Sequence, residues 1–166
     1  FLNLSYESPT LRKMQERVFR EQLRLALELE LPVIVHSRGG AHATTARVLE
    51  EEGMQAVGGC IQFFEGTQDD VARYVELGFA FTIGSSVTFP DPGGWYEAVR
   101  AVPDELLLLE TDAPYLPHAG KGSEQSTGAD IHVVAEAVAR VRNVVPAVVR
   151  ARSVANLRKV LSRISG

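Results

Sequence analysis

One histidine and two carboxylates stand directly after short apolar segments of this sequence. His36 ends the run at residues 33–35, and Glu110 and Asp112 follow the leucines at residues 106–109. Imidazole and carboxylate groups are the ligands that Zn²⁺, Mn²⁺ and Mg²⁺ accept from proteins. A bound ion of this kind lowers the pKa of its water, which then becomes a nucleophile near neutral pH. These residue types therefore indicate a divalent-metal site in which His36 and Asp112 hold the ion.

The same residues also admit a structural interpretation. A histidine at the end of a strand can hydrogen-bond a neighbouring loop, and an aspartate before Ala-Pro can cap the turn in which it lies. Glu110 and Asp112 are two residues apart, so in an extended segment they share a face. Periodicity alone leaves both interpretations of His36 and Asp112 open.

Two cations are candidates for binding a substrate phosphate. Arg38 lies two residues after His36, in a glycine loop that leads into a predicted helix. Helix N-termini and glycine turns bind anions through backbone N–H groups, and an arginine can add a bidentate contact. Lys121 belongs to the long Gly-, Ser- and Pro-rich loop at residues 114–128, and loops of that length are often functional. For Arg38 taken in isolation an ordinary surface position is the favoured interpretation, and a lone lysine in a glycine loop is a weak signal.

The elements that must position these side chains alternate between short apolar strands and longer amphipathic helices. Ser8 and Pro9 predict the start of the first helix, with serine as the cap and proline in the first turn. The patterns predict strands at residues 33–36, 57–63, 79–83 and 105–109, with residues 1–5 as a candidate fifth. They predict helices at residues 9–30, 42–52, 68–77, 95–101, 130–143 and 146–162.

This alternation predicts an α/β fold with parallel strands. The four interior strands are apolar throughout, as in a sheet that is covered on both faces. In such folds ligands bind at the carboxyl ends of the strands, where His36, Gln62 and Glu110 stand. A barrel typically needs about 250 residues, so the length of 166 residues by itself favours an open doubly wound sheet over a (β/α)₈ barrel.

Composition places the chain among ordinary globular domains. Hydrophobic residues make up 45% and charged residues 23% of the 166 residues, enough for one domain with a core. The net charge of −4 argues against a broad basic surface that coats nucleic acid. No apolar run is long enough to span a membrane, and the single cysteine, Cys60, cannot form an internal disulfide, so we expect a cytoplasmic protein. The sequence does not indicate an oligomeric state.

Three segments together resemble the TatD family of metal-dependent deoxyribonucleases. Residues 31–38 read LPVIVHSR, residues 64–66 read FEG beside the family's FSG, and residues 107–116 read LLLETDAPYL. The resemblance implies a TIM barrel that hydrolyses phosphodiester bonds of DNA, often as a 3′–5′ exonuclease, with one or two divalent metals. It implies that His36 and Asp112 are metal ligands, that Asp112 also orients the attacking water, and that Arg38 and Lys121 are candidates for substrate phosphate.

The departures from the family pattern concern the metal ligands. The family's opening His-x-His strand has no counterpart here, and its metal-bridging glutamate falls at Phe1 or just before it. A second family histidine falls at Gln62, whose oxygen is a weak ligand compared with imidazole. We therefore expect a partial TIM (β/α)₈ barrel with about five parallel strands and flanking helices. Residues 1–166 then form a single domain, the C-terminal portion of a TatD-like barrel.

Two other functional classes stay open. Loss of most of the ligand set is compatible with a catalytically silent relative that serves as a phosphate-binding, nucleic-acid-binding or scaffold module. An amidohydrolase-type barrel that cuts C–N bonds is the third interpretation. Metal content separates the metal-dependent enzyme from the silent module. Activity on DNA ends, compared with activity on amides, separates the nuclease from the amidohydrolase.

Overall fold

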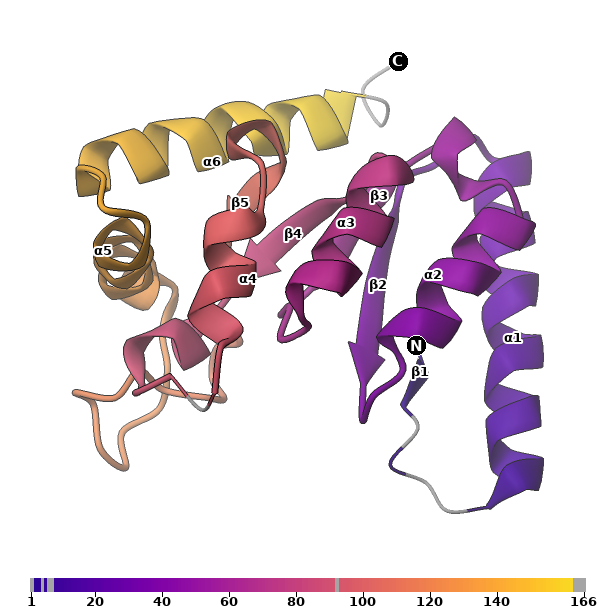
Figure 1. Ribbon diagram of the computed structural model, residues 1–166, viewed down its shortest axis with the longest axis horizontal. Coiled ribbons are helices and arrows are strands. Elements are labelled where there is room, and N and C mark those ends of the chain that lie inside the picture. Colours follow the sequence, from indigo (N-terminus) through magenta and orange to yellow (C-terminus); the bar gives the residue numbers. More distant parts are fainter. Residues whose placement is uncertain (1, 4, 6–7, 92, 163–166) are drawn as a thin grey trace.

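Five parallel strands form one sheet at the centre of the molecule (Figure 1). The computed structural model describes residues 2–3, 5, 8–91 and 93–162. The strands are β1 (Leu2–Asn3), β2 (Val33–Arg38), β3 (Gly59–Gln62), β4 (Ala80–Ile83) and β5 (Leu107–Leu109). Their spatial order, β1-β2-β3-β4-β5, is the order of the chain.

Sequential strand order decides between the two architectures. A doubly wound sheet reverses its strand order at a switch point, whereas each strand of a (β/α)₈ barrel follows its predecessor around the sheet. The preference for an open doubly wound sheet, drawn from length alone, was therefore wrong. The partial barrel of about five parallel strands with flanking helices is confirmed.

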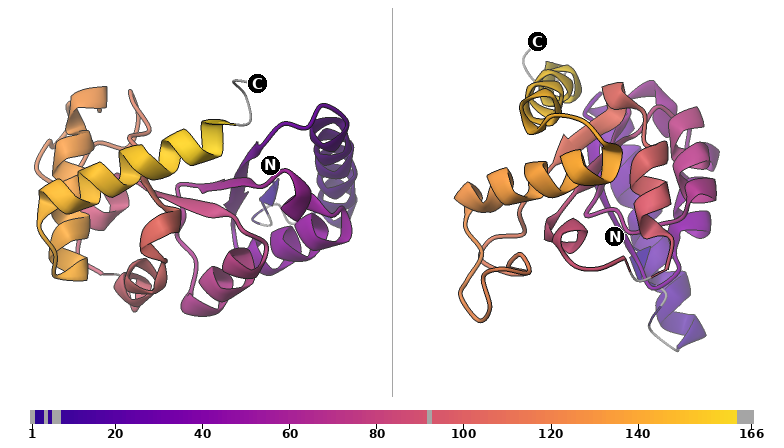
Figure 2. Two further views of the ribbon diagram at one scale, coloured as in Figure 1. Left: turned by 90° about the horizontal axis from the view of Figure 1, so that it is seen from above. Right: turned by 60° about the vertical axis from the view of Figure 1, so that its left-hand side comes forward.

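Within the described part of the chain, six α-helices flank the sheet and pack on one another in sequence. They are α1 (Pro9–Glu28), α2 (His42–Glu51), α3 (Gln68–Glu76), α4 (Trp95–Ala101), α5 (Ile131–Arg142) and α6 (Pro146–Leu161). Helix α2 packs on α3, α3 on α4, α4 on α5 and α5 on α6, and α1 and α5 lie at opposite ends of the layer (Figures 1 and 2). None of the helices within the described ranges combines the length and apolar character that crossing a bilayer requires.

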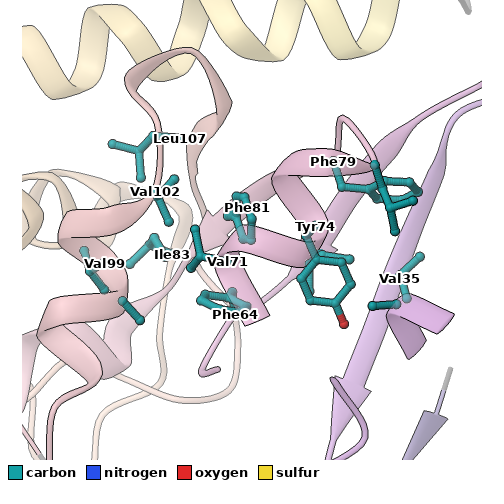
Figure 3. Packing of buried hydrophobic residues seen from close by; sticks show 14 of the residues in the cluster. Val35, Phe64, Val71, Tyr74, Phe79, Phe81, Ile83, Val99, Val102 and Leu107 are labelled. Carbon is teal, nitrogen blue, oxygen red and sulfur yellow. The ribbon is translucent and has the colours of Figure 1, made fainter. Parts of the chain in front are cut away.

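The main hydrophobic core lies between the sheet and helices α2 to α5. Alternate strand residues such as Val35, Phe81 and Leu107 point into it, where they meet Phe64 and Tyr74 (Figure 3). Phe64 and Phe81 pack edge to face with their ring centroids 5.0 Å apart. This core fixes the side of each strand that carries the polar residues, because successive side chains on a strand alternate between faces.

The opposite face of the sheet is only partly covered. Cys60, Ala80 and Leu108 form a second, small cluster there, and Val160 of α6 packs against it. Ile34, which pairs with Cys60 in the β2–β3 register, is 77% exposed. The expectation that the interior strands are covered on both faces was therefore wrong for β2. Cys60 itself is buried, and burial raises the pKa of its thiol to about 12, as expected for an inert thiol.

Helix α6 is tied to the sheet by one buried amide. Asn156 Nδ2 donates to the carbonyl oxygens of Asp104 and Leu107, at 2.8 and 2.9 Å. Asp104–Leu106 forms a 3₁₀ turn rather than the start of the strand, and Leu106 N donates to Pro103 O at 3.0 Å in this turn. The helix anchors β5, which carries Glu110 at its end.

The N-terminal part of the chain, helix α1 and strand β1, agrees with the sequence patterns only in part. The Ser8 side chain caps α1 by accepting a hydrogen bond from Leu11 N at 3.4 Å. Phe19 and Leu23 are buried, but Met14 and Val18, which share their helical spacing, are each 51% exposed. Of the candidate strand at residues 1–5, Leu2–Asn3 is a strand, whereas Phe1 and Leu4 lie outside the described residues.

Candidate functional site

Two polar side chains meet at the carboxyl ends of β2 and β3. The register pairs His36 with Gln62, and His36 Nδ1–H donates to Gln62 Oε1 at 2.6 Å. Since an amide oxygen only accepts, this bond selects the imidazole tautomer whose lone pair is on Nε2. Metal-binding histidines are commonly oriented in this way by a second hydrogen bond. The oxygen of Gln62 that was considered as a weak metal ligand is therefore already engaged with His36.

A buried carboxylate lies at the end of β5. Glu110 N donates to Ile83 O at 3.1 Å, which continues the ladder between β4 and β5. Burial raises the pKa of Glu110 to about 6, and the charge of Asp112 adds to this rise, while Thr82 and Arg38 oppose it. Its Oε1 atom is buried and finds no hydrogen-bond partner among the described residues. The position of Glu110 at a strand end was predicted, but its burial was not, and the Glu-x-Asp spacing is the sequence signal that marks the pair.

Charged residues from the ends of two different strands, β2 and β5, influence the pKa of Glu110. Arg38 from the end of β2 and Asp112 from the segment after β5 both act on the pKa of Glu110. The strands β3 and β4 stand between β2 and β5 in the sheet. The turn after Asp112 is closed by its backbone carbonyl, which accepts from Tyr115 N at 2.7 Å.

Arg38 is engaged with an acidic and an aromatic side chain. Its Nη1 donates to the carboxylate of Glu65, and its guanidinium carbon lies 4.8 Å from the centroid of the Phe63 ring. Phe63 lies against Gly84, where a Cβ atom would come within 2.2 Å of the ring. The glycine turn beside Arg38 has a packing explanation, because a Cβ atom at Gly39 would be only 2.3 Å from Ser5 Oγ.

Lys121, the second candidate for binding phosphate, is already paired with a carboxylate. Its Nζ bonds both carboxylate oxygens of Asp130, at 2.7 and 2.9 Å, and its side chain is 14% exposed. The ion pair holds the pKa of Asp130 near 2. His118 Nε2 lies 4.0 Å from the same carboxylate. Lys121 and His118 therefore stabilise the start of α5 through the loop.

The remaining histidines lie on helices. His132 lies on α5 and is exposed. His42 is half-buried at the start of α2, where its ring packs against Phe64 and Tyr74. Burial lowers the pKa of His42.

The donor set at the strand ends fits a divalent ion in kind but not in number. An imidazole with a defined tautomer, an aspartate and an orphaned buried carboxylate oxygen are suitable ligands for Zn²⁺, Mn²⁺ or Mg²⁺. A catalytic zinc site takes about three protein ligands. Within residues 2–3, 5, 8–91 and 93–162, no three His, Cys, Asp or Glu side chains come together as a metal-binding group. The described part of the chain does not complete a metal centre alone.

The sequence matches the family described as TatD related DNase over residues 2–162. The chain belongs to the TatD family. Among its relatives, the metal-dependent hydrolase YabD of Bacillus subtilis (strain 168) is 36% identical over 132 residues, which are 78% of this chain and 50% of YabD. A protein of Pantoea vagans (strain C9-1) named 3′-5′ ssDNA/RNA exonuclease TatD is 40% identical over 105 residues, 63% of this chain and 40% of that protein.

Solved structures of the TatD family share this fold. The crystal structure of YjjV, a TatD homologue from Escherichia coli K12, superposes with a TM-score of 0.87 at 27% identity. The match covers 96% of this chain and 60% of YjjV. The chain spans about half the length of the curated relatives it matches. Relatives of this TatD-family chain are named both as metal-dependent hydrolases and as exonucleases.

Proposed function

We propose that this chain forms the C-terminal portion of a TatD-like barrel and takes part in metal-dependent hydrolysis of DNA phosphodiester bonds, as a 3′–5′ exonuclease does. The observation that carries the proposal is the arrangement of His36, Glu110 and Asp112 at the carboxyl ends of parallel strands in one sheet. Membership of the TatD family supports metal-dependent hydrolysis as the reaction class. The exonuclease name of the Pantoea vagans relative supports nucleic acid as the substrate.

His36 and Asp112 are the proposed ligands of one or two divalent ions, Mg²⁺, Mn²⁺ or Zn²⁺. Such an ion, when bound, lowers the pKa of a water molecule and stabilises charge on the phosphate oxygens. Gln62 has the supporting task of holding the His36 ring in the tautomer that presents Nε2. Asp112 also orients the water, and Arg38 offers its guanidinium to a substrate phosphate.

Three features support a portion of a barrel rather than a self-sufficient unit. Ile34 is an apolar strand residue on the inner face of the sheet, yet it is 77% exposed. The interior of a complete (β/α)₈ barrel is packed with such side chains. The ligand set is incomplete within the described part of the chain, and the curated relatives have about twice the length of the segment they share with it. The remaining ligands would come from other barrel units.

The incomplete ligand set also favours a second candidate function. A TatD-family chain that holds no metal could still act as a phosphate-binding, nucleic-acid-binding or scaffold module through Arg38. The two candidates differ in what His36 and Asp112 do: they bind a metal in the first and are dispensable in the second.

The test is degradation of a 5′-labelled single-stranded DNA oligonucleotide by the complete barrel protein that contains this C-terminal portion, with Mg²⁺, Mn²⁺, Zn²⁺ or EDTA. We expect shortening from the 3′ end that needs a divalent ion and is lost in His36→Ala and Asp112→Asn. His132→Ala, at an exposed position on α5, is the matched control and should keep the activity. DNA binding without cleavage under any metal supports the silent module. Cleavage of amides and not of DNA supports the amidohydrolase class.

A further inference from the structure

Arg38, the candidate for binding a substrate phosphate, already forms an ion pair with the carboxylate of Glu65. Arg38 Nη1 donates to Glu65 Oε2, and the two side chains are 24% and 38% exposed. Glu65 is the middle residue of the FEG segment at residues 64–66.

Arg38 keeps its position by a contact that does not involve Glu65. The guanidinium lies over the ring of Phe63, 4.8 Å from its centroid, and stacking of this kind orients the plane of the group. Phe63 is 3% exposed, and the absence of a side chain at Gly84 leaves the space for its ring. Loss of the Glu65 carboxylate would thus leave Arg38 stacked on a fixed aromatic surface.

Glu65 has room to move away. It is an exposed residue between β3 and α3, and it borders a shallow hollow that is also lined by residues 66–69 and by Gly93, Gly94, Trp95 and Glu97. A carboxylate that turns into this hollow stays in contact with water, so it pays little desolvation. An exposed arginine–carboxylate pair is also weak enough for another anion to replace it.

We propose that Glu65 is a built-in competitor for phosphate at Arg38, which an incoming phosphate group must displace before it can contact the guanidinium. This inference rests on the proposed role of Arg38 in binding substrate phosphate. The competition lowers the affinity for any single phosphate. It favours ligands that make further contacts, such as a nucleic acid strand with several consecutive phosphates, over free phosphate or a mononucleotide.

The experiment is a titration of the 166-residue chain with inorganic phosphate in EDTA at low salt, followed by calorimetry or NMR. Glu65→Gln should bind phosphate about two- to fivefold more tightly than the unchanged chain, which is the strength of an exposed ion pair expressed as a ratio of affinities. Asp69→Asn is the matched control. Asp69 is an exposed acid four residues from Glu65, and the substitution removes the same charge without changing the ion pair. Its affinity should change little.

Two arginine variants separate the competitor role from the proposed function. Arg38→Ala should weaken phosphate binding, and Glu65→Gln should bring no gain in the Arg38→Ala background, because the two residues act as a pair. If Arg38→Ala binds as well as the unchanged chain, or no variant binds phosphate, the assignment of phosphate to Arg38 fails. If Arg38→Ala loses binding while Glu65→Gln does not gain, or Asp69→Asn gains equally, the competitor role of Glu65 is overturned. Circular dichroism of each variant verifies that the fold is retained.

Discussion

His36 and Gln62 are joined by a hydrogen bond of 2.6 Å between two neighbouring strands, at the edge where the sheet presents its polar groups. The bond links a candidate metal ligand to the residue that stands where the TatD family has a second histidine. It makes Gln62 a positioning residue for the imidazole, with consequences that can be measured without any metal.

Gln62→Ala should release the tautomer preference of His36. With the amide acceptor present, Nδ1 carries the proton, and without it the neutral ring distributes the proton over both nitrogens. The ¹⁵N chemical shifts of the His36 ring, measured above pH 8 in EDTA, report this change. Metal affinity should fall by about tenfold in the same variant, which is the usual cost of removing an orienting partner. Unchanged ring shifts would contradict the positioning role.

Glu110 should make stability depend on pH. Burial raises its pKa from 4.5 to about 6, so the folded state holds the proton more tightly than the unfolded state. The loss of stability caused by the buried charge is absent below pH 4.5. It grows as the pH rises from 4.5 to about 6, and it is complete above about pH 6. Glu110→Gln should therefore be more stable than the unchanged chain at pH 8 by up to about 2 kcal/mol, and similar to it at pH 4.

Urea unfolding in EDTA at the two pH values measures this difference. The neighbouring charges that act on Glu110 are those of Asp112 and Arg38. Asp112→Asn is a useful comparison, because removing its charge should lower the pKa of Glu110 and shift the transition to lower pH. An equal effect of Glu110→Gln at both pH values would show that the carboxyl group is not buried as the structure has it.

Gly84→Ala should disturb Phe63 and, through it, Arg38. A Cβ atom at Gly84 would lie 2.2 Å from the Phe63 ring, far inside van der Waals contact, so the ring must move. Overpacking of this kind costs about 1–3 kcal/mol. Gly128→Ala is the control, since nothing lies within 4 Å of its Cβ position. Thermal unfolding compares the two, and equal melting temperatures would contradict the close contact.

Asn156→Ala should weaken the attachment of α6 to the sheet. The change leaves the buried carbonyls of Asp104 and Leu107 without their donor, which costs about 1–3 kcal/mol each time a buried polar group is left unpaired. Leu157→Ala, at a neighbouring position that is 46% exposed, should cost much less. Denaturant unfolding of both variants provides the comparison. A smaller effect at Asn156 than at Leu157 would contradict the anchoring role.

The sequence predicted which residues stand at the strand ends, because hydrophobic runs and the turn residues after them mark those ends directly. His36 and Glu110 were found in this way. It did not predict that Gln62 bonds His36, since that contact depends on the β2–β3 register. Nor did it predict the Arg38–Glu65 pair, which joins the end of β2 to the segment after β3, beside Phe63, a residue with a positive φ of 47°.

Periodicity also could not say what covers an apolar face. Met14 and Val18 have the helical spacing of core residues, and Ile34 has the position of a buried strand residue, yet all three are more than half exposed. Spacing defines a face, whereas burial depends on what packs against that face. The length argument misjudged the architecture for a related reason, because it assumed that 166 residues must close their own sheet.

The most direct measurement is calorimetric titration of the metal-free complete barrel protein that contains this chain with Zn²⁺ and Mn²⁺, compared across three single variants. We predict that the unchanged chain and His132→Ala bind the ion alike, and that His36→Ala and Asp112→Ala each lose at least tenfold in affinity. Equal affinity in all four proteins would contradict the account, because His36 and Asp112 would then not share an ion at the ends of β2 and β5.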